Sequence, residues 1–205
     1  MGYEESLQYL YGLERLGVRL GLDNILRLLG RLGDPHTAFP SVHVAGSKGK
    51  GSVCAFLDGV LRKAGYRVGL YTSPHSVRFN ERVRVDGEAI PDNDVVRLTE
   101  ATRPHAEAMQ AQGEANQPTF FEFTTALAFR YFQEREVDIA VVEVGMGGRL
   151  DATNVLLPRV TVVTHIEREH TQYLGRTIQR IAREKAGIAK EGIPLWTMDQ
   201  EALPV

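Results

Sequence analysis

A glycine-rich segment at residues 44–52, VAGSKGKGS, limits what this chain can fold into more than any other part of it. A glycine-rich turn between a strand and a helix directs backbone N–H groups and the positive end of the helix dipole at one point, which suits a polyphosphate. The spacing departs from G-x-x-x-x-G-K-[ST], because Val44 replaces the first glycine and Ser52 stands one residue late. We therefore predict a variant P-loop. The residues expected to bind the nucleotide phosphates are Gly46, Ser47, Lys48, Gly49, Lys50, Gly51 and Ser52.

Apolar periodicity predicts that helices and strands alternate along the chain. We expect helices at 4–16, 23–32, 51–64, 92–112, 120–135 and 176–189. We expect strands at 41–45, 67–72, 137–144, 159–166 and 192–197, and a small hairpin arm at 81–87. The helix at 51–64 is expected to bury one apolar face, made by Val53, Phe56, Leu57, Val60 and Leu61. This order indicates an α/β fold with a doubly wound, mostly parallel sheet, whose ligands lie at the carboxyl ends of the strands.

Charge and cysteine content exclude several classes of protein. The formal net charge of −2 gives no reason to expect bulk binding to nucleic acid or to an anionic membrane. Cys54 is the only cysteine, so no intramolecular disulfide can form. No apolar run reaches membrane-spanning length, and Glu4 and Glu5 stand where a signal peptide needs basic residues. We expect a cytoplasmic monomer, and a chain that stops inside a domain, because residues 201–205 supply no obvious closing helix.

Four polar residues stand near the ends of predicted strands or in the helix that follows. Ser73 follows the strand at 67–72, and Glu143 closes the apolar run at 137–144. His170 follows the strand at 159–166, and Lys185 lies in the next helix. Each alone has a structural explanation, as a turn, surface or helix residue, although a buried carboxylate such as Glu143 costs several kcal/mol unless a metal or base pairs with it. Beside a phosphate loop, the four residues indicate a magnesium–nucleotide site.

The motifs occur in an order that resembles the folylpolyglutamate synthase / dihydrofolate synthase family, relatives of the Mur ligases. The matching segments are HVAGSKGKGS (43–52), YTSPH (71–75), PTFFE (118–122), EVGMGGRLDATN (143–154), EHT (169–171) and REKAGI (183–188). The block 145–154 distinguishes this family from the Mur enzymes. The chain departs from the family pattern at Ser47 and Lys48, where Thr and Asn are usual. It also departs at His165, where Asn or a small residue is usual, and at Glu169, where Asp is usual.

The resemblance implies an ATP-dependent ligase that joins L-glutamate to dihydropteroate, to the γ-carboxylate of folate, or to both, through an acyl phosphate. Residues 1–205 would form most of the N-terminal ATP-binding domain, and a C-terminal Rossmann-like domain would be absent from this chain. ATP and Mg²⁺ would bind together. Ser73 and Glu143 would hold one Mg²⁺, and His170 would hold a second with Glu143. Lys185 would be a carbamate that contributes an anionic oxygen. The resemblance makes Lys50, Lys185 and His170 the catalytic residues.

The resemblance also places the pterin ring of the substrate. Phe121 would stack on the ring, and Asp151 would accept its hydrogen bonds. Phe120 and Phe121 both also fit core packing, and one of the two is expected to do that. The complete set of residues expected around the substrate is Val18, Arg19, Leu20, Thr119, Phe120, Phe121, Glu122, Asp151 and Ala152.

Three alternatives stay open at this point. The protein could be another Mur-type ligase that acts on a different carboxylate. It could be a P-loop switch or kinase, although the block 147–151 counts against that class. The isolated 205 residues could also be an inactive nucleotide-binding fragment.

Overall fold

The computed structural model describes residues 1–198 and is built on a seven-stranded sheet in the order β4-β3-β2-β5-β1-β6-β7. The strands are β1 Ser41–Ala45, β2 Val68–Tyr71, β3 Val83–Val85, β4 Glu88–Ala89, β5 Ile139–Glu143, β6 Val160–Val163 and β7 Leu195–Thr197. Neighbours among β2, β5, β1, β6 and β7 pair in parallel, and β3 and β4 add an antiparallel edge. The predicted mostly parallel α/β sheet is confirmed. The predicted chain ending at 201–205 lies outside the described residues.

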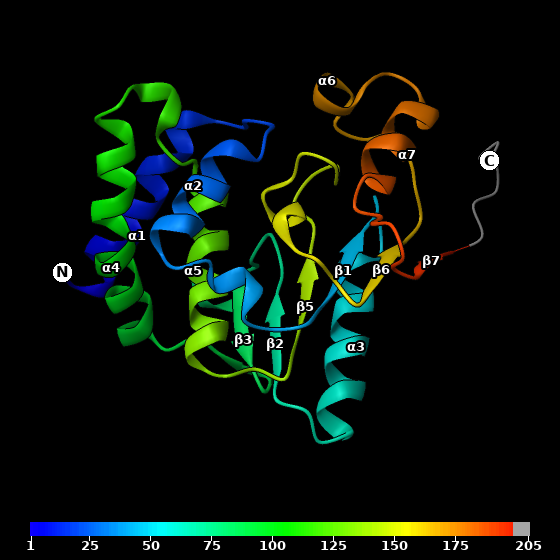
Figure 1. Cartoon of the computed structure of the whole chain (residues 1–205), viewed down its shortest axis with the longest axis horizontal. Coiled ribbons are helices and arrows are strands. Elements are labelled where there is room, and N and C mark those ends of the chain that lie inside the picture. The colour runs from blue at the N-terminus through cyan, green and yellow to red at the C-terminus, as the bar shows by residue number, and fades with distance from the viewer. Residues whose placement is uncertain (199–205) are drawn as a thin grey trace.

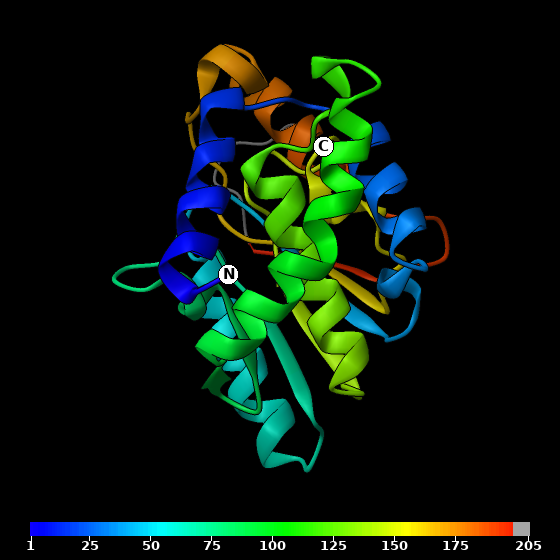
Figure 2. The same ribbon diagram turned by 90° about the vertical axis from the view of Figure 1, so that its left-hand side faces the viewer.

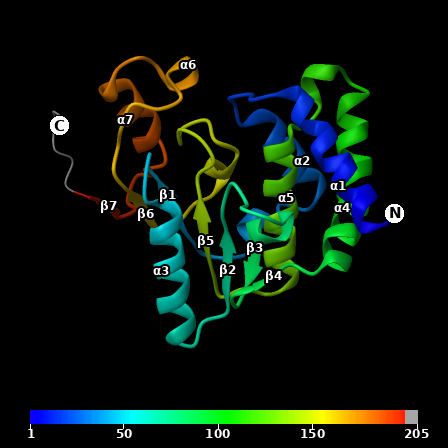
Figure 3. The same ribbon diagram turned by 180° about the vertical axis from the view of Figure 1, so that it is seen from behind.

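Helices cover both faces of this sheet. They are α1 Tyr3–Gly12, α2 Asp23–Arg31, α3 Lys50–Lys63, α4 Asp92–Gln110, α5 Phe120–Glu134, α6 Thr171–Leu174 and α7 Ile178–Ala186. Short 3₁₀ segments lie at Leu13–Leu16, Pro35–Thr37, Phe79–Arg82, Glu114–Asn116 and Ala152–Val155. Helices α1, α2, α4 and α5 form one layer, which Figure 2 views from outside, and α3 lies on the opposite side of the strands (Figures 1 and 3).

The core formed by residues 1–198 consists of three clusters, and alternation along the strands divides them. Tyr71 and Val142 point into the large cluster under α1, α2, α4 and α5. Val44 and Val141 point the other way, toward α3. Ala45 and the α7 residues belong to a smaller cluster at the β1–β6 end of the sheet. The β5 run is therefore buried on both faces, as a central parallel strand requires.

The predicted apolar face of the helix after the glycine-rich loop is partly wrong. Phe56 and Val60 of α3 are 73% and 68% exposed, whereas Cys54 and Asp58 are buried. The segment carries apolar side chains around more than half of its circumference, so periodicity alone could not fix which of them face the sheet. Those that do pack against it are Val53, Leu57 and Leu61.

The other boundary differences are small. The helix predicted at 4–16 ends at Gly12 and continues as a 3₁₀ turn, and the predicted arm at 81–87 becomes the antiparallel β3–β4 pair. The carboxyl ends of β1, β2, β5 and β6 then meet along one edge of the sheet, and this edge carries the site (Figure 1).

Candidate nucleotide and substrate site

The glycine-rich loop joins the end of β1 to the start of α3, as predicted. Gly46 has φ +147°, and a Cβ there would lie 1.8 Å from the hydroxyl oxygen of Thr164. Gly49 has φ +82° and caps α3. Both positions therefore need glycine, because the left-handed backbone and the close approach exclude a side chain. The N–H of Ser47 donates to the carbonyl of His165 at 2.8 Å, which ties the loop to the segment after β6.

The two lysines of the loop differ in their surroundings. Lys48 is 72% exposed and pairs with Glu167, with 2.8 Å between Nζ and Oε2. Lys50 is the first residue of α3, is half-buried, and has no hydrogen-bond or ion-pair partner among residues 1–198. An ammonium group without a partner at a helix N-terminus is available to an anionic ligand.

Lys185 is buried beneath the loop. Only 1% of its side chain is exposed, and Nζ donates to the Gly46 carbonyl at 2.8 Å and to Oε1 of Glu169 at 2.5 Å. Burial lowers the pKa of Lys185, and the bond to Glu169 acts against that shift. A lowered ammonium pKa favours the neutral amine, the form that carbamylation requires. The sequence analysis did not find the ion pair with Glu169, because it depends on the path of residues 165–170.

Glu143 lies where β5 ends and faces the loop. Its Oε2 accepts a hydrogen bond from the backbone N–H of Ser73 at 3.1 Å. A Cβ on Gly51 would lie 3.9 Å from both of its carboxylate oxygens. Burial raises the pKa of Glu143, and no basic side chain among the described residues forms an ion pair with it. A buried carboxylate beside a phosphate loop and a serine is a donor set that suits Mg²⁺, which takes few protein oxygens and completes its shell with water and phosphate.

The structure brings together only part of the predicted metal set. Ser73 and Glu143 are in direct contact, whereas Lys185 contacts the glycine-rich loop through the Gly46 carbonyl and not that pair. His170 is exposed, with φ +44°, and its imidazole makes no hydrogen bond or ion pair within residues 1–198, although its carbonyl accepts the N–H groups of Tyr173 and Leu174. No group of three or more His, Cys, Asp or Glu side chains suited to a metal occurs in the described part of the chain.

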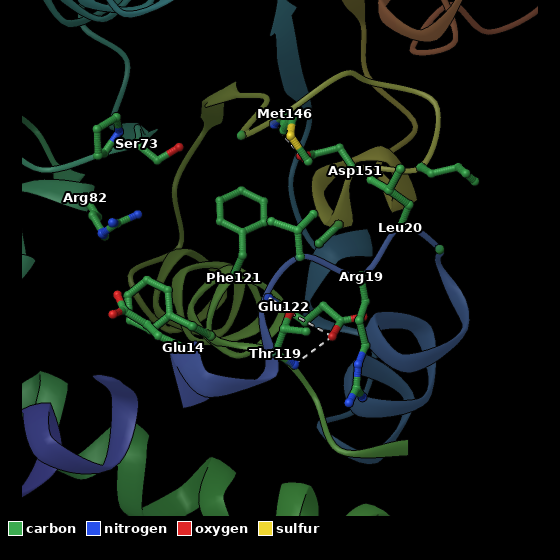
Figure 4. Close-up of a pocket in the computed structure, with 18 residues that line it drawn as sticks. Glu14, Arg19, Leu20, Ser73, Arg82, Thr119, Phe121, Glu122, Met146 and Asp151 are labelled. Atoms are coloured by element: carbon green, nitrogen blue, oxygen red, sulfur yellow. Dashed lines mark hydrogen bonds between the residues drawn. The ribbon is translucent and has the colours of Figure 1, made fainter. Parts of the chain in front are cut away.

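A cavity of about 320 Å³ opens beside Ser73 and extends away from the loop (Figure 4). All nine predicted substrate residues line it, and they come from three parts of the chain. They are Val18, Arg19, Leu20, Thr119, Phe120, Phe121, Glu122, Asp151 and Ala152. The lining also includes Glu14, Arg82, Met146 and Leu150, which the sequence analysis did not identify.

The two phenylalanines have different surroundings. Phe120 is 9% exposed and packs in the core, where its ring stacks on Tyr11 with 5.8 Å between centroids. Phe121 is half-buried and lies centrally in the view of the cavity in Figure 4, with Tyr71 beside its ring at 6.0 Å. A Cβ on Gly145 would lie 2.5 Å from Cζ of Phe121, so the glycine leaves room for this ring. The expectation that one of the pair packs in the core is confirmed.

Several predicted substrate residues also have structural partners. Thr119 and Glu122 form a capping box at the start of α5, with the N–H and hydroxyl of Thr119 donating to Oε2 of Glu122 at 2.7 and 2.9 Å. Asp151 is buried and accepts hydrogen bonds from the N–H of Met146 and of Thr153. Arg19 donates to the carbonyls of residues 114, 115 and 117, which fixes the 17–21 segment against the loop before α5.

No helix in the described residues 1–198 is long and apolar enough to cross a membrane.

Comparison with known proteins identifies relatives along nearly the whole chain. Residues 44–194 match the model of the Mur ligase middle domain. The dihydrofolate synthase/folylpolyglutamate synthase of Bacillus subtilis is 46% identical over 206 residues, which is 99% of this chain and 48% of that protein. The chain thus spans about half the length of the curated relatives it matches.

Solved structures agree with this result. The structure described as an FPGS–AMPPCP complex has a TM-score of 0.91 and 44% identity, covering 98% of this chain and 48% of that one. Escherichia coli FolC in complex with DHPP and ADP has a TM-score of 0.84 and 38% identity, covering 94% of this chain and 45% of that one. The chain therefore belongs to the Mur ligase middle domain family, and its resemblance to the folylpolyglutamate and dihydrofolate synthases is confirmed.

Proposed function

We propose that this chain forms the nucleotide and folate-binding part of an ATP-dependent ligase. The ligase joins L-glutamate to dihydropteroate, to folate, or to both. One observation carries the proposal. A cavity with an aromatic wall reaches Ser73, which is bonded to Glu143, and Glu143 faces the phosphate loop. A substrate with a flat ring at one end and a carboxylate at the other would bind in this cavity with its carboxylate beside the terminal phosphate of ATP.

The proposed reaction has two steps. A carboxylate oxygen of the substrate attacks the γ-phosphorus of ATP, which gives an acyl phosphate and releases ADP. The amine of L-glutamate then attacks the acyl carbon, so that an amide forms, phosphate leaves, and the amine loses a proton. Because little covalent chemistry falls to the protein, its contribution is position and charge. The loop N–H groups and Lys50 would hold the phosphates, and Phe121 would orient the ring.

Glu143 and Ser73 would hold a Mg²⁺ ion that arrives with ATP and neutralises charge on its phosphates. We also propose, from the family resemblance, that His170 and a carbamylated Lys185 help to bind a second Mg²⁺ ion. The burial of Lys185 and the lowered pKa of its ammonium support the carbamate. A cytoplasmic location and a monomeric state stay predictions from the sequence.

The test uses the polypeptide that contains residues 1–205, with ATP, Mg²⁺, L-glutamate and dihydropteroate. We expect dihydrofolate and ADP to form in equal amounts, and hydroxylamine to divert the acyl phosphate to a hydroxamate. ADP release that does not depend on dihydropteroate would favour the nucleotide switch. Turnover with a muramyl substrate in its place would favour the other Mur-type ligases.

A further inference from the structure

Arg82 is a buried cation in the wall of the substrate cavity, and it has no anionic partner in the described part of the chain. The residue is 7% exposed and lines the cavity beside Ser73, and Figure 4 shows its guanidinium group on the same side of the cavity as Ser73. No carboxylate among residues 1–198 lies within ion-pair distance of it, although the chain's other arginines include many that are paired on the surface. A buried charge normally has a counter-ion, because desolvation of an unpaired ion costs several kcal/mol.

The protein fixes this guanidinium in place with neutral groups. Its Nε donates to Nδ1 of His75 at 2.8 Å, and its Cζ lies over the ring of Phe120 at 5.1 Å from the centroid. The Arg82 carbonyl accepts the N–H of Thr72 at 3.0 Å, which fixes the backbone against the end of β2. The neighbours therefore hold the side chain but leave its charge uncompensated, and the terminal N–H groups have no hydrogen-bond partner within the described residues.

The charged groups around Arg82 do not replace a counter-ion. Burial and the Arg82 charge lower the pKa of His75, so the imidazole is the neutral acceptor that the Nε bond requires. Glu81 directs its carboxylate to the N–H groups of residues 76–78. Glu14 lines the same cavity but lies beyond 4.0 Å from the guanidinium, outside ion-pair range.

We propose that Arg82 binds the substrate carboxylate that is to be phosphorylated. This inference rests on the proposed function and adds a binding residue to it. The guanidinium has planar paired N–H donors, which match a carboxylate in a two-bond arrangement. Arg82 lies at the end of the cavity next to Ser73, where the nucleotide site begins. It would therefore hold the carboxylate toward the γ-phosphate while Phe121 holds the ring.

The test compares three ligands by equilibrium binding to wild type and variants. The ligands are pteroate, the same molecule with hydrogen in place of the carboxylate, and 4-aminobenzoate. A charge-assisted bidentate bond lost from a buried site predicts that Arg82→Met weakens pteroate binding by about 10- to 100-fold. The same substitution should leave the decarboxylated analogue within about 3-fold of wild type. The pteroate affinity of Arg82→Lys should lie between those of wild type and Arg82→Met, because lysine keeps the charge and loses the two-bond geometry.

Arg84→Met is the matched control. Arg84 lies two residues further along the chain, in β3, and lines a different cavity next to α3, so its loss should leave pteroate binding unchanged. Circular dichroism shows whether Arg82→Met is folded. If it is not, Arg82→Lys replaces it as the folded variant, and the wild-type preference for pteroate over the decarboxylated analogue is measured beside it.

The outcomes separate the two proposals. If wild type binds pteroate and the decarboxylated analogue equally well, the role of Arg82 is overturned and the proposed function stands. If neither pteridine binds, but 4-aminobenzoate binds and is lost in Arg82→Met, the carboxylate site stands and the folate substrate is wrong. If wild type binds none of the three, both proposals are overturned.

Discussion

The substitution Gly145→Ala would test the aromatic wall of the cavity without touching any polar group. The added Cβ would lie 2.5 Å from Cζ of Phe121 and 2.9 Å from Cε1 and Cε2. Carbon atoms in contact need about 3.5–4.0 Å, so the ring must move by about 1 Å. Tyr71 on one side of it is fully buried and bonded to the Thr124 and Thr125 hydroxyls. The cavity is the space left for the movement.

We expect a modest loss of stability and a larger loss of binding. Overpacking of this kind costs about 1–3 kcal/mol. Loss of ring stacking alone is worth about 0.5–1.5 kcal/mol, and the displaced ring also fills part of the cavity. Together these predict an affinity for pteroate reduced about 10-fold or more, while MgADP binds within about 3-fold of wild type.

Isothermal titration calorimetry with pteroate and with MgADP measures both quantities, and thermal melts follow stability. Gly59→Ala is the control, because a Cβ there meets nothing within 4 Å. Alanine in the middle of a helix should raise the free energy of unfolding by about 0.5–1 kcal/mol. A folded Gly145→Ala protein that binds pteroate like wild type would refute the reasoning, because the ring would then not form the wall of the substrate site.

Three further predictions concern the charged groups. Lys50→Ala should weaken MgADP binding at least about 10-fold without unfolding the chain, whereas exposed Lys48→Ala should change it less than about 3-fold; calorimetry with the nucleotide compares them. Burial raises the pKa of Glu143, so without metal Glu143→Gln should be the more stable protein at pH 8, and urea unfolding should show this advantage vanish as the pH falls below about 4. Lys185→Met should lower the free energy of unfolding by about 2 kcal/mol, because Glu169 loses its partner; an unchanged urea midpoint would contradict this.

The centre of the site could be predicted from the polar residues at the ends of the predicted strands. Ser73 and Glu143 are 70 residues apart, yet Ser73 lies just after β2 and Glu143 ends β5, and parallel strands bring their ends together. The glycine-rich loop was equally predictable, because Gly46 and Gly49 occupy backbone conformations that only glycine adopts easily.

Contacts that depend on loop paths and helix rotation could not be predicted. The pairing of Lys185 with Glu169 follows from how residues 165–170 turn, which periodicity does not encode. In the sequence, Arg82 is one of several polar residues in an alternating segment. Its burial depends on tertiary contacts with Phe120 and His75, which the sequence pattern does not encode. Phe56 has the apolar character of a core residue, yet α3 packs with a different face toward the sheet.

The central claim is that the loop and the cavity form one site, in which the substrate carboxylate is phosphorylated by ATP. Isotope transfer tests this directly. Dihydropteroate labelled with ¹⁸O in its carboxylate is turned over with ATP, Mg²⁺ and L-glutamate by the polypeptide that contains residues 1–205. The inorganic phosphate is then examined by ³¹P nuclear magnetic resonance. An acyl phosphate intermediate predicts that each phosphate released carries one oxygen from the carboxylate. Unlabelled phosphate, formed together with dihydrofolate, would contradict the account.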